Sequence, residues 1–291
     1  MDYEEDEEVD PTKVGANVAQ NLLPPPTKKI VYDEDAATEE PTHSGALILV
    51  TATGQTDKGL RRKRNEDSLL ALPNEGVFVV ADGMGGYRGG EIASALAVKT
   101  IEEAFRKTSF EGPEHDSIPR RASELARAIN SANTAILAHA ADVKELSGMG
   151  TTICAARFSR NKQRLYIGHV GDSRIYRHRR GELKQMTSDH TMKDLGVTGA
   201  AGAHLSRAVG VWPSVPIDII LAKPEPADLY LLCSDGLTKM VTDDGIRDIV
   251  GSGASPTIIV EDLIGKANAS GGKDNITVIV IRVEDPATSP R

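Results

Sequence analysis

Short runs of β-branched and large apolar residues recur along the chain between about residues 46 and 283. Gly, Asp, Asn or Pro residues bound these runs, as they commonly bound the strands of globular proteins. The pattern predicts strands at 46–53, 68–72, 76–81, 150–158, 163–170, 173–178, 182–186, 215–222, 228–234 and 275–283.

Four other segments carry apolar residues at spacings of three and four, which is typical of amphipathic helices. In one of them Ile92, Leu96, Ile101 and Phe105 fall on a single stripe. Helices are expected at 90–107, 121–146, 243–250 and 256–269. Strands are grouped and helices come in pairs, whereas a doubly wound parallel sheet needs the two to alternate. The order therefore predicts an α+β protein with antiparallel sheets covered by helices.

The composition divides the 291 residues into a tail and one domain. The first 44 residues hold 12 of the 42 acidic residues, 3 of the 34 Lys and Arg, and a run of three prolines. Such a segment buries too little apolar surface to offset the entropy of ordering. We expect a disordered acidic tail at 1–44, a single domain at 45–285 and a short C-terminal tail at 286–291.

Charge and composition exclude several classes of protein. Removing the 12 acidic and 3 basic residues of the tail from totals of 42 and 34 leaves 30 acidic against 31 basic residues. This balance offers no basic face for nucleic acid. Apolar runs such as 229–233 are far shorter than the roughly 20 residues of a membrane span, and the acidic start does not resemble a secretory signal. Two isolated cysteines, Cys154 and Cys233, favour a reducing cytoplasm.

Three aspartates lie at the ends of the most apolar predicted strands, namely Asp82, Asp235 and Asp274. In an antiparallel sheet the end of one strand lies beside the start of its neighbour, so these carboxylates can converge. The first two belong to Asp-Gly pairs, which singly most often mark hairpin turns, and we expect Asp244-Gly245 to be such a turn. Converging carboxylates bind cations or stay partly protonated.

Oxygen ligands alone select hard ions such as Mg²⁺ or Mn²⁺. The seven histidines are scattered, and we interpret most of them as ordinary surface or core residues. Four basic residues, 61–64, directly precede the acidic pair Glu66 and Asp67. Because guanidinium groups bind phosphate oxygens in bidentate fashion, this arrangement suits a site that holds an anion against metal ions.

Together these motifs resemble the bacterial protein phosphatase 2C-like (PPM) serine/threonine phosphatases. The resemblance covers nearly all of residues 46–283 and rests on motifs in the order of that family. They are GLRRKRNED (59–67), VVADGMGG (79–86), GMGTT (148–152), HVGDSR (169–174), TSDHT (187–191), LSRAVG (205–210), CSDGL (233–237) and GKDNIT (272–277). The resemblance implies a four-layer α-β-β-α sandwich, with two antiparallel sheets flanked by helix pairs.

The resemblance also implies roles for individual residues. Asp82 would bridge two Mn²⁺ or Mg²⁺ ions, Asp235 and Asp274 would complete the site of the first, and the Gly83 carbonyl would bind the second. Two more residues, Glu66 and Asp67, would hold waters bound to the metals. The catalytic residues would be Asp82 and Arg62, the latter as the phosphate-binding arginine.

The implied reaction is the hydrolysis of phosphoserine and phosphothreonine monoesters by direct attack of a water that bridges the two metals. The implied partners are phosphoproteins, including Ser/Thr kinases, and the chain is expected to be a monomer. In some family members a histidine after the first Asp-Gly serves as general acid, but here Met84 stands there and the proton donor is unassigned. A third metal site depends on whether Glu145 replaces an aspartate that bacterial members often carry.

Two other functions fit parts of the sequence. Residues Cys154 to Arg160 match the Cys-x5-Arg pattern of cysteine phosphatases, although the segment has the pattern of a strand and lacks the internal glycine. A pseudophosphatase that binds phosphoproteins without hydrolysing them would keep the same fold. The intact Asp82, Asp235, Asp274 and Arg62 favour the enzyme over this binding module.

Overall fold

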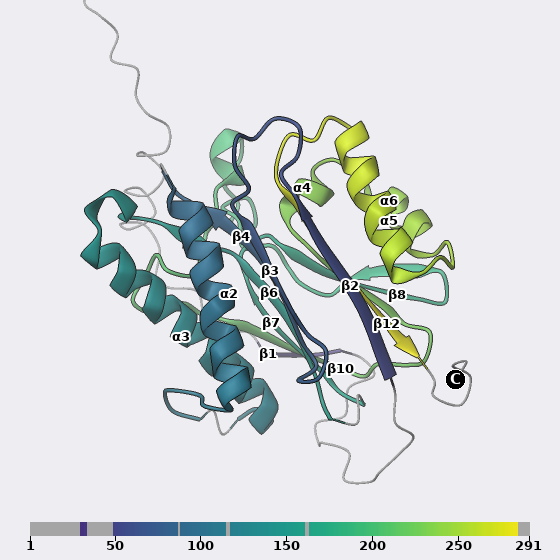
Figure 1. The fold of residues 1–291 in the computed structure, drawn as a ribbon, viewed down its shortest axis with the longest axis horizontal. Coiled ribbons are helices and arrows are strands. Elements are labelled where there is room, and N and C mark those ends of the chain that lie inside the picture. Colours follow the sequence, from purple (N-terminus) through teal and green to yellow (C-terminus); the bar gives the residue numbers. More distant parts are fainter. Residues whose placement is uncertain (1–29, 34–48, 87, 115–116, 161–162, 285–291) are drawn as a thin grey trace, which may run out of the picture.

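The computed structural model describes residues 30–33, 49–86, 88–114, 117–160 and 163–284, which form two stacked β-sheets between two layers of helices (Figure 1). The first sheet has the strand order β1-β10-β7-β6-β4-β3, with β5 paired to β4. Its strands are β1 (Ile30–Tyr32), β10 (Asp218–Ala222), β7 (Leu165–Val170), β6 (Ile153–Phe158), β4 (Val77–Met84), β3 (Asp67–Leu72) and β5 (Gly150–Thr151). The order of the second sheet is β2-β12-β11-β8-β9. Its strands are β2 (Leu49–Asp57), β12 (Ile276–Glu284), β11 (Leu229–Cys233), β8 (Arg174–Arg179) and β9 (Glu182–Gln185).

Two long helices cover the first sheet and three shorter ones cover the second (Figure 1). The first pair is α2 (Gly89–Lys107) and α3 (Arg120–Asp142), and the others are α4 (Asp235–Thr238), α5 (Asp243–Val250) and α6 (Pro256–Ala269). Two short 3₁₀ helices, η1 (Lys144–Leu146) and η2 (Ala200–Ala203), lie in connecting segments. Helix α6 begins at a Ser255 cap that accepts the N–H of Ile258, followed by Pro256 at the first helical position.

Alternation along the strands creates three hydrophobic cores, one between each pair of adjacent layers. In β4, Val77 and Val79 pack beneath α2 and α3, whereas Phe78 and Val80 pack between the sheets. Since side chains of a strand alternate between its two faces, the next residue on the inter-sheet face is Asp82. Periodicity alone thus directs this carboxylate toward the second sheet. The α-β-β-α sandwich predicted from the sequence is confirmed.

The N-terminal region differs from the prediction in one respect. Strand β1 pairs in parallel with β10, an exception to the expected antiparallel sheets. Asp33 follows it, is 7% exposed, and accepts hydrogen bonds from Arg177 at 2.6 Å and Lys184 at 2.8 Å. Strand pairing and ion pairs therefore order residues 30–33. An expectation based on composition does not include such contacts with distant parts of the chain. The rest of the predicted tails, 1–29, 34–44 and 286–291, lies outside the described residues.

No Asp-Gly pair forms the hairpin turn that such pairs usually mark. Asp82-Gly83 continues strand β4, Asp235-Gly236 begins α4, and Asp244-Gly245 lies in the first turn of α5. The expectation for Asp244 is wrong because the Thr242 side chain caps α5 by accepting the N–H of Gly245. Within the described part of the chain, no helix combines the length and apolar character needed to cross a bilayer.

Candidate active site

The predicted carboxylates meet where four strands from both sheets end, near the top of Figure 1. Asp67 begins β3 and pairs directly with Asp82 near the end of β4. Asp235 follows β11 as the first residue of α4, and Asp274 precedes β12, which pairs with β11. The side chains converge from both sheets although they are far apart in sequence.

The convergence disfavours the charged form of the central carboxyl groups. Burial, followed by the charges of Asp67, Asp235, Asp172 and Asp274, holds the pKa of Asp82 well above its ordinary value. Burial also raises the pKa of Asp67 to about 6, and hydrogen bonds to the carboxylate only partly oppose this effect. Like charges this close need a cation or a proton to balance them.

Asp67 ties the two sheets together through its carboxylate. Its Oδ2 accepts hydrogen bonds from Ser234 Oγ at 2.8 Å and Thr277 Oγ1 at 2.7 Å, both in the second sheet's region of the site. Its Oδ1 is buried and has no hydrogen-bond partner. An unpartnered buried carboxylate oxygen is rare in proteins, and it leaves one acceptor directed at no protein donor.

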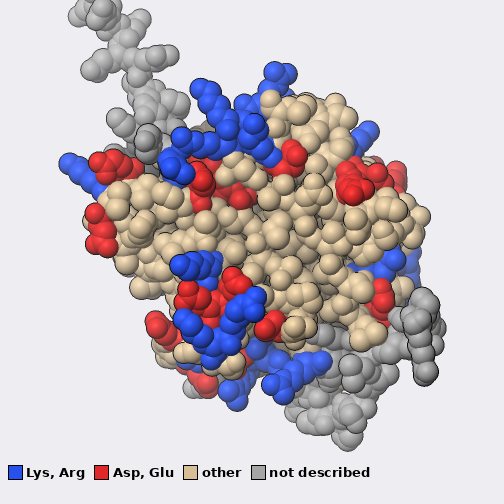
Figure 2. Space-filling model, viewed as in Figure 1, with Lys and Arg blue, Asp and Glu red and all other residues tan. Residues whose placement is uncertain are grey.

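The loop between β2 and β3 brings the basic run to the same place. Figure 2 shows Lys and Arg side chains over this loop at the top of the view, with acidic side chains below them. Arg62 Nη2 lies 2.8 Å from Asp274 Oδ2, and its Nη1 lies 4.0 Å from Glu66 Oε2. The Arg62 side chain remains 48% exposed, so its guanidinium is accessible to a substrate. Burial raises the pKa of Glu66, and the nearby Arg62 opposes that shift.

Asn275 fixes the shape of this loop. Its side-chain amide donates to the carbonyls of Lys58 at 2.9 Å and Arg64 at 2.8 Å, while its Oδ1 accepts the N–H of Glu66 at 2.8 Å. One buried side chain thus holds the segment that presents Arg62. The sequence predicted no role for Asn275, because an Asn beside an Asp has no local feature that indicates contacts over 200 residues away.

Glycine is required at Gly83 by close backbone approach. A Cβ there would lie 2.1 Å from the Gly90 carbonyl oxygen and 2.5 Å from that of Glu66. The Gly83 N–H donates to the same Glu66 carbonyl at 3.1 Å. The start of α2 therefore packs directly on the strand end that carries Asp82, and the absence of a side chain at Gly83 permits this contact.

Two charged residues of the cluster were not predicted. Burial and the charge of Asp235 raise the pKa of Asp172 to about 7. Lys239 Nζ forms an ion pair with Asp235 Oδ2, one helical turn away. Asp172 lies within the motif 169–174, so its position was marked in the sequence but its role was not. Lys239 had no such signal.

A cavity of about 580 Å³ opens beside this cluster. Asp172, Arg174 and Lys239 line it on the side of the carboxylates, and Thr191 and Lys193 line it from the segment that follows β9. A cavity of this size is in the range of small-ligand sites. It offers room beside the carboxylates for a phosphorylated side chain.

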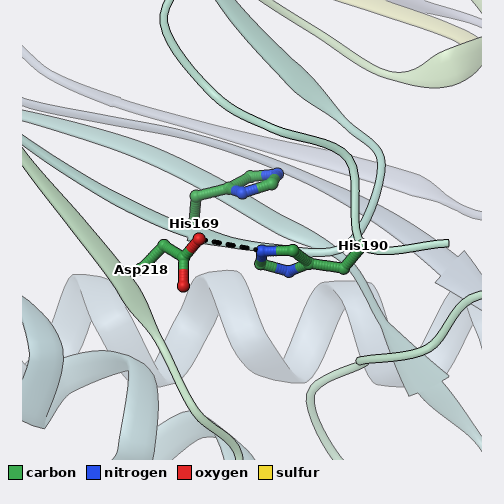
Figure 3. Close-up of side chains that lie close together, drawn as sticks. All are labelled: His169, His190 and Asp218. Carbon is green, nitrogen blue, oxygen red and sulfur yellow. Dashed lines mark hydrogen bonds and ion pairs between the residues drawn. The ribbon is translucent and has the colours of Figure 1, made fainter. Parts of the chain in front are cut away.

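A second group of side chains, His169, His190 and Asp218, is buried close to the site (Figure 3). Their potential ligand atoms lie within 4.8 Å of one another, as a metal would require. However, Asp218 already receives Arg207 Nη1 at 2.7 Å and His190 Nε2 at 3.1 Å. Burial lowers the pKa of His169 to about 3, so this ring is neutral.

Arg207 balances the Asp218 carboxylate, which indicates a structural role for this group, although His169 Nδ1 is buried without a hydrogen-bond partner. His190 also accepts the N–H of Gly171 at 3.1 Å, next to Asp172. The expectation that the histidines are scattered, ordinary residues missed this cluster, since the two rings meet only through tertiary contact at 4.6 Å.

The carboxylate cluster fits hard divalent cations. Its donors are all oxygens, its central carboxyl groups repel one another, and Asp67 Oδ1 lacks a partner. Residues Asp82, Asp235 and Asp274, with the Gly83 carbonyl, could hold Mn²⁺ or Mg²⁺. Glu145 is exposed in η1, and a third metal site stays a prediction.

The cysteine mechanism is contradicted by the structure. Cys154 lies in the middle of the stacked sheets with 0% of its surface exposed. Burial raises the pKa of its thiol well above the ordinary value. A nucleophilic cysteine needs a lowered pKa and access to substrate, so Cys154 is a core residue.

Comparison with protein families agrees with this arrangement. Residues 60–255 match the family model described as protein phosphatase 2C. A serine/threonine phosphatase, stp, of Listeria welshimeri is 35% identical over 243 residues, which cover 78% of this chain and 93% of that protein.

Solved structures show the same similarity. The catalytic domain of the serine/threonine protein phosphatase PstP, determined with two manganese ions, is 34% identical, with a TM-score of 0.70. The match covers 82% of this chain and 100% of that chain. A serine/threonine phosphatase of S. agalactiae gives a TM-score of 0.72 at 30% identity, over 81% of this chain and 100% of that one.

Proposed function

This chain belongs to the protein phosphatase 2C family, and we propose that Asp82, Asp235 and Asp274 hold the metal ions of its phosphatase reaction. The chain is a metal-dependent protein serine/threonine phosphatase that acts on phosphoproteins in signalling and uses Mn²⁺ or Mg²⁺. The observation that supports the proposed ligands is the convergence of carboxylates from both sheets around the unpartnered Asp67 Oδ1.

Divalent cations bound there would supply Lewis-acid chemistry, lowering the pKa of water and offsetting charge on the phosphoryl oxygens. The three aspartates and the Gly83 carbonyl would hold the cations. Glu66 and Asp67 would accept hydrogen bonds from water in the site and so orient it for attack on phosphorus in line with the leaving oxygen.

Arg62 would bind the non-bridging phosphoryl oxygens. Its guanidinium is half-exposed and held beside Asp274 at 2.8 Å, so it is positioned at the site before a substrate arrives. Bidentate contact would orient the phosphorus and offset the charge that develops on its oxygens.

The pseudophosphatase alternative is disfavoured, because the ligand carboxylates and Arg62 are all present and assembled. We further propose that residues 45–285, completed by strand β1 and Asp33, form the catalytic domain, that phosphorylated Ser/Thr kinases are among its substrates, and that it acts as a cytoplasmic monomer. The two cysteines, buried and unpaired in the structure, support a reducing compartment.

Mn²⁺ titration of two matched variants tests the metal ligands. Asp274→Asn should lose one Mn²⁺ in calorimetry and nearly all hydrolysis of a phosphothreonine peptide. The control Asp244→Asn changes an exposed acidic residue that pairs with Arg247 on α5. It should keep the Mn²⁺ stoichiometry and the peptide hydrolysis of the wild type. Circular dichroism would verify that each variant is folded. Unchanged stoichiometry and activity in Asp274→Asn would show that the ligand assignment is wrong.

A further inference from the structure

A second cavity, of about 550 Å³, lies at the opposite end of the first sheet from the carboxylates. It is lined by the turn before β4, the end of β6, and the facing ends of α2 and α3. Strand β4 runs between the two places. The eight residues from Glu75 to Asp82 span about 23 Å at the usual rise of a strand, so this cavity is separate from the proposed active site.

Arginines dominate the lining of this cavity. Four of them line it together with two glutamates, and they are Arg120, Arg121, Arg157 and Arg160. Glu124 is shared between Arg120 Nε at 3.0 Å and Arg157 Nη2 at 2.5 Å. Among the described residues, no carboxylate lies within ion-pair distance of Arg121 or Arg160. The cavity therefore carries an excess of positive charge.

Arg157 adds a buried donor that has no acceptor. The residue is 7% exposed, and its guanidinium carbon lies 4.8 Å from the centre of the Phe105 ring. Nη1 donates to the Arg121 carbonyl at 2.7 Å and Nη2 pairs with Glu124, but Nε has no hydrogen-bond partner. A buried guanidinium N–H without an acceptor is unusual in a native protein, and an oxyanion in the cavity would supply the acceptor.

The start of α3 points to the same kind of ligand. This helix of 23 residues begins at Arg120 after Pro119, whose side chain offers no cap, and its first turn contains no acidic residue. The amino end of a helix carries partial positive charge and exposed N–H groups, which favour acids and bound anions. Here Arg120 and Arg121 occupy the first turn instead.

We propose that this arginine cavity, lined by Arg120, Arg121, Arg157 and Arg160, binds a phosphate-type oxyanion away from the catalytic site. Arg121 and Arg160 supply uncompensated charge, Arg157 Nε supplies a buried donor, and the start of α3 adds its partial charge. A tetrahedral dianion matches the forked donors of arginine. The ligand is either inorganic phosphate, the product of the reaction, or a second phosphoryl group on a phosphoprotein substrate.

Binding can be tested by NMR on the full-length, Mg²⁺-loaded protein titrated with inorganic phosphate. Amide signals of the first turn of α3 and of residues 157–160 should shift and saturate. The double variant Arg121→Ala/Arg160→Ala should lose these shifts but still hydrolyse p-nitrophenyl phosphate as the wild type does. Arg106→Ala, in an exposed arginine of α2 paired with Glu102, should retain them.

Two results would overturn the proposal. One is the absence of a saturable shift at the start of α3 up to about 10 mM phosphate, above the millimolar Kd that a few such contacts supply. The other is an identical titration in the double variant. Loss of p-nitrophenyl phosphate hydrolysis in every protein would instead count against the proposed function, so the two failures are distinguishable.

Peptide kinetics separate the two sources of phosphate. A peptide whose two phosphoserines are about ten residues apart could span the distance, since about seven extended residues cover about 23 Å. If substrates dock here, the double variant raises KM for this peptide and leaves kcat, and the KM of a singly phosphorylated peptide, unchanged. If free phosphate is the ligand, the KM values of both peptides are unchanged and the NMR shifts still depend on Arg121 and Arg160.

Discussion

Asp67 lies directly opposite Asp82 in the antiparallel pairing of β3 and β4, so the two carboxylates stand on the same face of the first sheet. That face packs against the second sheet, from which Ser234 and Thr277 donate hydrogen bonds to Asp67. Two like charges are thus held together by the sheet register itself. The site is prepared for cations and is unfavourable without them.

This relationship predicts opposite effects of Asp67→Asn on activity and on stability. The amide keeps the shape of the side chain and removes one of the repelling charges. At neutral pH the free energy of unfolding of the metal-free variant should therefore equal that of the metal-free wild type or exceed it by about 1–2 kcal/mol. Mn²⁺ affinity and turnover should fall by about tenfold or more, as for other residues that support metal ligands. Thermal unfolding with and without Mn²⁺ measures the stability and the metal affinity, and hydrolysis of a phosphopeptide measures the turnover, with Asp244→Asn as control. A clear loss of metal-free stability would contradict the explanation.

Arg62→Ala should raise KM for phosphopeptides by about 10–100-fold, the effect of removing a charged hydrogen bond worth about 1.5–3 kcal/mol. Arg61→Ala serves as the matched control, because Arg61 is an exposed arginine of the same loop and forms no ion pair within the described residues. Its KM should stay within about twofold of the wild type. Steady-state kinetics on both variants measure these KM values. Equal increases in KM would mean that the loop contributes only its overall positive charge.

Metal binding should release protons near pH 6. Burial and neighbouring charges raise the pKa of Asp67 to about 6 and that of Asp172 to about 7. Both groups hold protons more tightly in the folded state than in the unfolded state, so their contribution favours folding at low pH and is lost as pH rises through about 6 to 7. Incoming cations must displace these protons.

The apparent Mn²⁺ affinity should therefore fall as the pH is lowered from about 7.5 to 5.5, across the pKa values of about 6 and 7. Calorimetry in two buffers with different ionisation enthalpies counts the protons released, and Asp67→Asn should reduce that number. Binding with no proton release at pH 6 would show that the carboxylates are already ionised without metal.

Truncation tests the ordered part of the N-terminal segment. A chain that starts at residue 45 lacks β1 and the Asp33 carboxylate that pairs with Arg177 and Lys184. It should lose about 3 kcal/mol of stability, because removing one partner of a buried ion pair leaves the other charge uncompensated. A chain that starts at Ile30 should match the full-length protein in chemical denaturation. Equal stability of the two truncated chains would mean that β1 contributes nothing to the fold.

The sequence determined most of the elements and the chemistry of the site. Bounded runs of β-branched and apolar residues, together with helical spacing, predicted the boundaries of most elements within a few residues, and helices α5 and α6 have their predicted bounds. The elements can be predicted from neighbouring residues alone, because buried positions recur at a regular spacing within one strand or helix. The positions of Asp82, Asp235 and Asp274 at strand ends indicated a metal site for the same reason, and the linked motifs indicated the family.

Only the tertiary structure decided which groups meet. Asp67 contacts Ser234 and Thr277 across sequence separations of 167 and 210 residues, and Asn275 holds a loop more than 200 residues away. Strand β1, Ile30–Tyr32, is ordered by pairing with β10, although the 44-residue segment that contains it has the overall composition of a disordered tail. Such contacts depend on the stacking of two sheets and leave no periodic trace in the chain. The pKa values of the carboxylates follow from the same stacking, because burial and neighbouring charges exist only after the sheets have packed.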